Sequence, residues 1–296
     1  MVLHVINNIE IGEYVMPLVQ MKDILMKANQ ENYGVGAFSV TNMEMVMGAI
    51  KAAEELSSPL ILQIAEVRLN HSPIHMIGPL MVAAAKQATV PVAVHFDHGM
   101  TFEKIQETLE IGFSSVMFDG SHYPLEENIQ KTKEIVELAK QYGATVEAEI
   151  GRVGGSEDGP EDIEMLLTST TEAKRFAEET DVDALAVAIG NAHGMYNGDP
   201  NLRLDRLQEI NDVVHIPLVL HGGSGISPED FKQCIQHGVR KINVATATFQ
   251  NVITAVNNTV LNTPYSDYFT YHQDVIKAAY ENVKSHMQIF GSENRA

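Results

Sequence analysis

Short apolar runs alternate with longer amphipathic segments along most of the chain. Each run has the length of a buried strand, and each longer segment repeats apolar residues at helical spacing. The eight predicted strands are residues 34–40, 59–64, 91–97, 115–120, 145–151, 184–190, 217–223 and 241–246. The predicted helices between them include residues 44–56, 102–111, 125–142, 171–180 and 228–237, several of which end at a glycine.

Strand–helix alternation of this length is typical of parallel strands joined by right-handed crossovers. Eight units in a row predict an α/β fold of the (β/α)8 barrel type, as one domain over residues 1–296. A doubly wound open sheet is the alternative, but no GxGxxG follows the first strand. Outside the barrel we expect an N-terminal arm at residues 1–17, a helix at 18–29 and a further C-terminal helix at 265–290.

The charge balance limits the class of partner. The 296 residues include 20 Lys and Arg against 39 Asp and Glu, a net charge of −19, and 45% are hydrophobic. This balance argues against a nucleic acid or an anionic membrane as partner, because little positive charge is available to neutralise phosphates. A small phosphorylated substrate is compatible with the negative net charge, since backbone N–H groups and helix ends can bind a phosphate.

The cysteine count and the length of the apolar segments indicate the cellular compartment in which the protein is expected. Cys234 stands alone, so no intrachain disulfide can form. The apolar segments are too short to span a bilayer, and the N-terminus lacks a basic stretch followed by an apolar one. We therefore expect a reducing compartment, most simply the cytoplasm.

Three histidines stand where predicted strands end, and barrel enzymes place their chemistry at the carboxyl ends of strands. His98, His193 and His221 each follow an apolar run and lie next to a glycine. Three imidazoles with an open fourth position form a catalytic zinc site, although three unrelated polar strand ends remain the alternative. His95 and His122 lie near strand ends as well, but we expect a supporting role for the first and no direct role for the second.

Acidic residues are predicted at the same rim. Asp97, Asp119 and Glu149 belong to strand ends, and Glu157 and Asp158 to a connection at residues 152–170. Asp97 adjoins a candidate ligand and could transfer a proton there. The connection is long and rich in glycine, which is typical of a mobile active-site loop that could bring Glu157 in as a base.

A glycine-rich turn predicts a phosphate site. The sequence HGGSG at residues 221–225 can direct several backbone N–H groups at one point, and Ser227–Pro228 begins a helix behind it. In barrels a phosphate commonly binds in the loops after strands seven and eight, here residues 221–225 and 243–246. An ordinary strand–turn–helix joint is the alternative.

Six motifs occur in order: HFDHG, FDGSHYPLEENI, VEAEIGRVGGSEDG, AVAIGNAHGMY, LVLHGGSGI and KINVAT. In them the chain resembles the class II, zinc-dependent ketose-bisphosphate aldolases, from about residue 18 to the C-terminus. The resemblance implies that His98, His193 and His221 bind Zn²⁺ or another divalent cation, and it allows a monovalent cation as well. It implies Asp97 as the acid/base at the hydroxyl of the cleaved bond and Glu157 as the group that moves the proton on the dihydroxyacetone phosphate carbon.

The resemblance also assigns the substrate contacts. The residues implied to bind dihydroxyacetone phosphate are Asn42, Gly194, Gly222, Gly223, Ser224, Asn243, Val244, Ala245 and Thr246. Asp119 and Glu149 match positions that approach a second or displaced metal in some relatives. A homodimer or homotetramer is expected from the family and from the C-terminal helices.

The chemistry agrees with a metal-dependent route. Retro-aldol cleavage leaves an enediolate, whose negative charge a bound cation stabilises. The competing barrel solution is a Schiff-base lysine, but we expect Lys241 to open the last strand, at the opposite end of the barrel. Two departures from the family concern the substrate: Ala65 replaces a serine, and Arg68 replaces a small residue. The final motif, with NVAT in place of NIDT, is closer to the tagatose-bisphosphate branch.

These patterns predict a reversible aldolase that cleaves tagatose 1,6-bisphosphate or fructose 1,6-bisphosphate to dihydroxyacetone phosphate and an aldehyde such as glyceraldehyde 3-phosphate. An aldolase for another phosphosugar, such as 6-phospho-5-dehydro-2-deoxy-gluconate, is an alternative, and Arg68 could serve an aldehyde-side phosphate or a carboxylate. A non-catalytic phosphosugar-binding barrel and a metal-dependent hydrolase are the alternatives from other classes.

Overall fold

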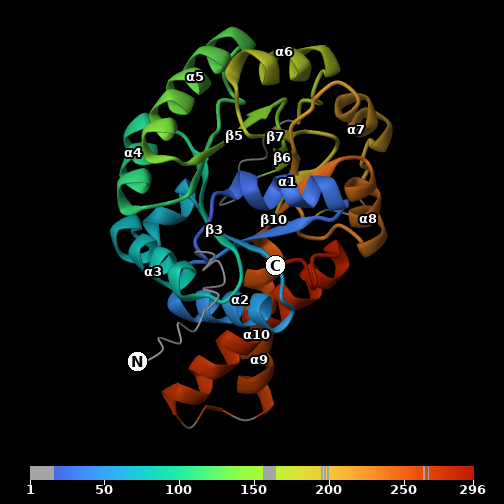
Figure 1. Ribbon diagram of the computed structural model, residues 1–296. Coiled ribbons are helices and arrows are strands. Elements are labelled where there is room, and N and C mark those ends of the chain that lie inside the picture. Colours follow the sequence, from blue (N-terminus) through green and yellow to red (C-terminus); the bar gives the residue numbers. More distant parts are fainter. Residues whose placement is uncertain are drawn as a thin grey trace, which may run out of the picture.

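A computed structural model describes residues 17–155, 165–194, 196, 198, 200–262, 264–265 and 267–296. Eight parallel strands close into a barrel that helices surround, which confirms the predicted (β/α)8 fold (Figure 1). The strands are β1 Val35–Ser39, β2 Leu60–Ala65, β3 Val92–Gly99, β4 Ser115–Phe118, β5 Thr145–Ile150, β7 Ala184–Val187, β9 Leu218–Leu220 and β10 Val239–Val244. Nearly all of the predicted arm, residues 1–16, lies outside the described residues.

Helices follow the strands around the barrel. They are α2 Met43–Glu55, α3 Ile74–Gln87, α4 Phe102–Ile111, α5 Leu125–Tyr142, α6 Thr170–Thr180, α7 Leu204–Asn211 and α8 Pro228–Gln236. Thr101, Ser169 and Ser227 begin three of them with a side-chain oxygen that accepts from a backbone N–H of the first turn. Gly112 ends α4 and Gly143 ends α5, both in the left-handed conformation, as the glycine positions predict.

One end of the barrel is closed by α1 Met21–Glu31, which lies across it (Figure 1). Met21 and Leu25 are fully buried and pack with side chains at the starts of the strands, including Val35, Ile61 and Ala93. This packing fills the amino-terminal end with apolar side chains. Polar chemistry is therefore confined to the opposite end, where the strands finish.

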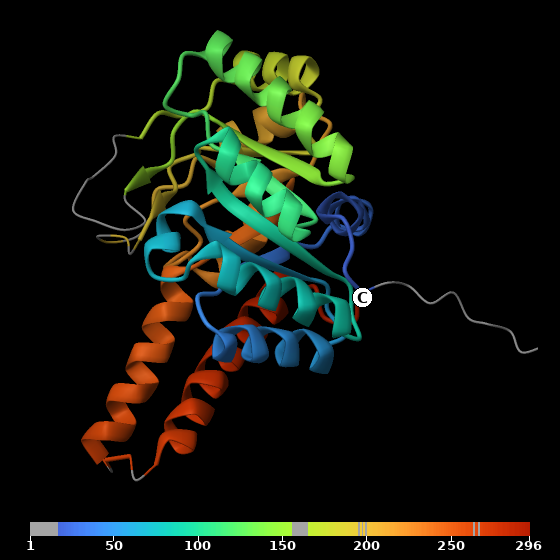
Figure 2. The ribbon, with the colours of Figure 1, turned by 90° about the vertical axis from the view of Figure 1, so that its left-hand side faces the viewer.

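The chain ends in two further helices, α9 Thr246–Asn262 and α10 Tyr268–Phe290. α10 packs on α2 from His272 onwards, and Gly48 of α2 permits close approach, since a Cβ there would lie 2.6 Å from the backbone oxygen of Ile276. The start of α10 and most of α9 project from the barrel as a hairpin (Figure 2). Among the helices that the structure describes, none is long and apolar enough to cross a membrane.

Candidate active site

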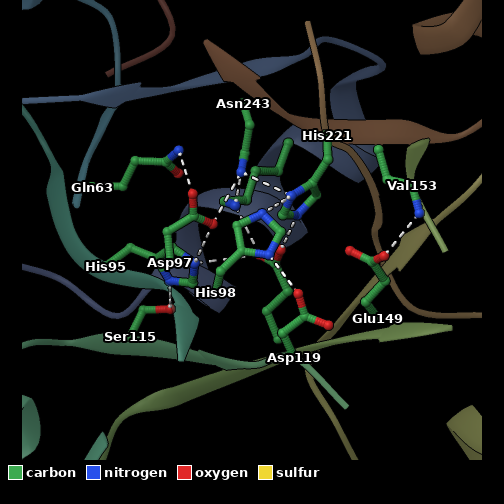
Figure 3. Close-up of polar contacts among 12 residues, drawn as sticks. Gln63, His95, Asp97, His98, Ser115, Asp119, Glu149, Val153, His221 and Asn243 are labelled. Carbon is green, nitrogen blue, oxygen red and sulfur yellow. Dashed lines mark hydrogen bonds and ion pairs between the residues drawn. The ribbon is translucent and has the colours of Figure 1, made fainter. Parts of the chain in front are cut away.

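Three histidines meet at the carboxyl ends of the strands. His98 belongs to β3, where the register to β4 shifts between Phe96 and Gly99. Its φ of +46° is a left-handed conformation that costs a non-glycine residue about 1–3 kcal/mol. A bulge of this kind redirects a side chain, and here the ring of His98 faces that of His221, with 4.6 Å between the ring centroids (Figure 3).

His193 is held by a small sheet of its own. β6 Gly154–Gly155 pairs in parallel with β8 Ala192–His193, with Gly155 opposite His193. Asn191 links this strand to the next histidine, because its side-chain Nδ2 donates to the backbone oxygen of His221 at 3.0 Å. The ring centroid of His193 lies 5.0 Å from that of His98, and one nitrogen from each of the three rings lies within 4.8 Å of the others.

Carboxylates behind two of the rings fix their protonation. His98 Nδ1 lies 2.7 Å from Asp119 Oδ2, and His221 Nε2 lies 2.8 Å from Glu147 Oε1. Since each carboxylate accepts, these nitrogens carry the protons, and lone pairs remain on His98 Nε2 and His221 Nδ1. Burial lowers the pKa of His221 well below its ordinary value, so the ring stays neutral.

The two lone-pair nitrogens face each other. His98 Nε2 and His221 Nδ1 are 2.8 Å apart, and Asn243 Nδ2 approaches His221 Nδ1 at 3.3 Å as a donor. At this distance the two nitrogens either share one proton in a hydrogen bond or bind a common cation. Neutral imidazoles with converging lone pairs are ligands for a divalent metal, so the donor set fits a zinc ion.

A second group of metal-type ligands shares His98. Asp119 and Glu149 each have an oxygen within 4.8 Å of the same histidine. Burial, together with the charge of Asp119, raises the pKa of Glu149 to about 8, and its Oε2 is buried without a hydrogen-bond partner among the described residues. For Asp119, burial would raise the pKa, but hydrogen bonds from His98 and Ser121 outweigh it and lower the pKa. A cation would relieve the orphaned oxygen of Glu149.

Asp97 is buried beside the histidines with both oxygens engaged. Gln63 Nε2 donates to its Oδ2 and Asn243 Nδ2 donates to its Oδ1, each at 3.0 Å (Figure 3). Two neutral amides hold the carboxylate in one orientation without adding a charge. His95 lies deeper, where its Nδ1 is 2.7 Å from Ser115 Oγ and burial lowers its pKa well below the ordinary value. A neutral, supporting His95 agrees with the sequence expectation.

Lys241 pairs with Val35, the first residue of β1, so its backbone lies towards the amino-terminal end of the barrel, as the sequence predicts. Its long side chain, however, extends to the site. Its Nζ donates to Asn243 Oδ1 at 2.6 Å and lies 2.9 Å from Glu147 Oε2. The sequence reasoning did not assign these contacts to Lys241 and missed Gln63 and Glu147, although a polar residue within an otherwise apolar strand could have indicated all three.

A pocket opens next to the histidines, on the side of β9 and β10. Its lining residues are Gln63, Arg68, His193, Gly194, Gly222, Gly223, Ser224, Asn243, Ala245 and Thr246. Most of the residues predicted to bind dihydroxyacetone phosphate thus line one pocket. Two do not: Val244 is buried within β10, and Asn42 is exposed and begins α2, where its Oδ1 accepts from Met45 N at 2.9 Å.

The remaining candidates lie elsewhere. Glu157 and Asp158, on the long connection, lie outside the described residues. His122 is exposed, and its ring stacks on that of Tyr123 with 3.9 Å between centroids. Among the described residues, the sequence-predicted set is therefore brought together except for Asn42 and Val244.

A closed parallel barrel with histidines and carboxylates gathered at the carboxyl ends of its strands defines the class of (β/α)8-barrel enzymes. A family model described as fructose-bisphosphate aldolase class-II matches residues 19–295. The chain therefore belongs to the class II fructose-bisphosphate aldolase family, whose members are zinc-dependent aldolases.

Relatives agree over almost the whole chain. A fructose-bisphosphate aldolase of Staphylococcus aureus is 39% identical over 288 residues, which cover 95% of this chain and 100% of the relative. A probable fructose-bisphosphate aldolase of Bacillus subtilis is 40% identical over 285 residues, with the same shares. In three dimensions, the YdjI aldolase from Escherichia coli K12 is similar with a TM-score of 0.85 at 35% identity, covering 94% of this chain and 99% of that one. A putative fructose-1,6-bisphosphate aldolase from Coccidioides immitis follows with a TM-score of 0.84 at 31% identity, covering 93% and 97%.

Proposed function

We propose that this protein reversibly cleaves tagatose 1,6-bisphosphate or fructose 1,6-bisphosphate to dihydroxyacetone phosphate and glyceraldehyde 3-phosphate. One observation carries the proposal: His98 Nε2 and His221 Nδ1 converge to 2.8 Å beside a pocket lined by a glycine turn. His98, His221 and His193 would hold the zinc ion. Asp119 and Glu147 would keep two of these rings in the metal-binding tautomer.

The protein's own groups divide the remaining work. A bound divalent cation supplies a Lewis acid that stabilises the negative charge of the breaking carbon–carbon bond. Asp97 takes the proton from the hydroxyl at that bond, and its two amide donors keep the carboxylate aimed. Glu157, outside the described residues, would move the proton on the dihydroxyacetone phosphate carbon.

The phosphate end is bound by backbone groups and a helix end. Gly222 and Gly223 lie on the pocket wall, where backbone N–H groups can reach a phosphate. Ser224 Oγ accepts from Ala247 N at 2.9 Å, which ties the turn to the first turn of α9. The amino-terminal end of α9 at Thr246 adds a positive dipole end to the same pocket.

We further propose that the protein works as a homodimer or homotetramer in the cytoplasm. The projecting hairpin of α9 and α10 supports an oligomer, because α9 has 17 residues, no charged side chain and only Thr248 buried. A surface helix in water usually carries charge on its outer face.

The direct test of the reaction is cleavage of both bisphosphates, coupled to enzymatic reduction of the dihydroxyacetone phosphate formed. We expect turnover of at least one bisphosphate, its loss after treatment with a chelator, and its return on addition of Zn²⁺. Equal and feeble rates of cleavage of both bisphosphates would contradict the substrate assignment. Cleavage that survives complete metal removal would contradict the metal-dependent mechanism.

Asp97→Asn separates a catalyst from a barrel that only binds phosphosugars. We expect kcat to fall roughly 10²- to 10⁴-fold, the usual contribution of a positioned acid/base, with binding of dihydroxyacetone phosphate retained. Asp181→Asn, at the exposed end of α6, is the matched control and should behave as wild type. Unchanged turnover in Asp97→Asn would remove this residue from the mechanism.

A further inference from the structure

We propose that Arg68 is the charged partner of the phosphate group of dihydroxyacetone phosphate, and that it selects a dianionic group at this end of the substrate. The identity of the ligand rests on the proposed function. The assignment of Arg68 to the phosphate end, and not to the aldehyde end, comes from where the side chain lies.

Arg68 shares a wall with the phosphate-binding elements. It lies in the short helix η1 Glu66–Asn70, directly after β2, and it lines the same pocket as Gly222, Ser224 and Thr246. Among the described residues that line this pocket, Arg68 carries the one permanent positive charge, and none has a carboxylate. Backbone N–H groups and a helix end supply partial charges there, so a guanidinium adds the full charge that a phosphate dianion attracts.

The guanidinium is oriented by an aromatic ring. Its central carbon lies 5.4 Å from the centroid of the Phe249 ring, within the range of a cation–π contact. Phe249 belongs to the first turn of α9, the helix whose amino-terminal end lines the pocket at Thr246. The ring therefore holds the planar fork of Arg68 beside the helix end, where it can donate two hydrogen bonds to one phosphate.

The backbone beneath Arg68 is also fixed. Its carbonyl oxygen accepts from His71 N at 2.9 Å and from Ser72 N at 3.0 Å. The proton-transfer candidate Asp97 is absent from the lining of this pocket. Arg68 shares this pocket with the anion-binding turn, and Gln63 and Asn243, the donors to Asp97, line it as well.

The experiment compares Arg68→Gln and Arg68→Lys with wild type, in the zinc-loaded full-length protein. Calorimetric titrations with inorganic phosphate, dihydroxyacetone phosphate and unphosphorylated dihydroxyacetone give binding that does not depend on turnover. Kinetics in the synthesis direction give separate KM values for dihydroxyacetone phosphate and for the aldehyde. Arg175→Gln, on an exposed arginine of α6, is the control.

We expect Arg68→Gln to raise the dissociation constant for dihydroxyacetone phosphate by roughly 10- to 100-fold, as for a lost hydrogen bond to a charged group. The affinity for inorganic phosphate should fall in parallel. The affinity for dihydroxyacetone and the KM for the aldehyde should not change. Arg68→Lys should recover part of the affinity for dihydroxyacetone phosphate. Phe249→Leu, which keeps the charge and removes the ring, should give a smaller loss.

An aldehyde KM that rises while dihydroxyacetone phosphate binding stays constant would overturn the proposal, as would unchanged binding of both phosphates. Failure of the proposed function has a different signature. If wild type binds inorganic phosphate through Arg68 but cleaves neither bisphosphate, the anion-binding role stands and the proposed reaction falls.

Discussion

Lys241 supports the site through two neighbours at once. Its Nζ lies 2.9 Å from Glu147 Oε2 and donates to Asn243 Oδ1, and all three side chains are buried. Glu147 in turn fixes the tautomer of His221, and Asn243 donates to Asp97. One buried ammonium therefore holds both a candidate metal ligand and the candidate proton-transfer group in place.

Lys241→Met should destabilise the protein strongly, because it leaves the Glu147 carboxylate buried without its counter-charge. We expect the free energy of unfolding to fall by about 3–5 kcal/mol, measured by denaturant titration of the metal-free protein. The double variant Lys241→Met/Glu147→Leu removes both charges and should recover much of that loss.

The control is Lys140→Met, since Lys140 pairs with Glu137 on the exposed face of α5. It should unfold like the wild type, because an exposed ion pair contributes little. If Lys241→Met were as stable as this control, Lys241 would have no role in holding Glu147.

The motifs predicted the residues of the site better than the residues that support it. His98, His193, His221 and Asp97 follow apolar runs, and barrel closure brings such strand ends together. Glu147 could not be assigned, because the partner of a polar residue inside a strand depends on which strands face it across the barrel. That information is in the register, not in the local sequence.

At the scale of elements, the glycine turn and the strand of His193 are in direct contact. Gly222 has a φ of +64°, and a Cβ built on it would overlap the carbonyl oxygen of Ala192. Tyr196 bridges the same two segments, since its hydroxyl donates to the Gly222 oxygen at 3.0 Å and accepts from Ala192 N at 2.9 Å. The phosphate-binding turn and the third histidine are therefore positioned together.

Gly222→Ala should consequently disturb both phosphate binding by the glycine turn and zinc binding by His193. We expect loss of phosphate binding and of bound zinc, together with a lower melting temperature, because Ala192 has to move away from the new methyl group. Gly198→Ala is the matched control: its φ of +101° is equally unfavourable for alanine, but nothing lies within 4 Å. Its free energy of unfolding should fall only by the backbone strain, about 1–2 kcal/mol, and it should keep its bound zinc. Equal zinc loss in both variants would contradict the proposed contact.

Elements with a clear period were predicted, and those without one were not. The helices named from the sequence did not include α3, α7 or α9. α3 contains Pro79 and has few polar residues, and α9 has polar but no charged residues, so neither shows the charged face that is usual for a surface helix, whereas α7 is only eight residues long. The two-residue strands β6 and β8 are too short to have any period, and they form only because the barrel brings them side by side.

At the scale of the whole molecule, the outer end of the hairpin of α9 and α10 carries exposed apolar side chains. Leu261 is 82% exposed and Phe269 is 75% exposed, on a projection that the barrel does not cover (Figure 2). Large apolar side chains gathered in this way are typical of an interaction surface. A second copy of the chain is the partner that the proposed oligomer supplies.

Leu261→Asp combined with Phe269→Asp should then dissociate the oligomer, because charged side chains would be buried in the interface without partners. Size-exclusion chromatography with light scattering measures the mass directly. The control is Met76→Asp, on the equally exposed Met76 of α3 (68% exposed), which should leave the mass unchanged. A wild-type protein that is already monomeric would remove the basis for this interface.

The division between the two ends of the barrel follows from the same sequence. Apolar side chains of α1 fill the amino-terminal end, and the histidines and carboxylates occupy the other. The barrel could be predicted because eight strand–helix units leave few alternatives. Glu157 and Asp158, on the long connection, lie outside the described residues.

The central claim is that three histidines bind one divalent cation, and anomalous diffraction at the zinc edge tests it most directly. Crystals of the zinc-loaded protein should give one strong peak within about 2.0–2.1 Å of His98 Nε2, of His221 Nδ1 and of a nitrogen of His193. A peak elsewhere, or none at these three nitrogens, would contradict the account.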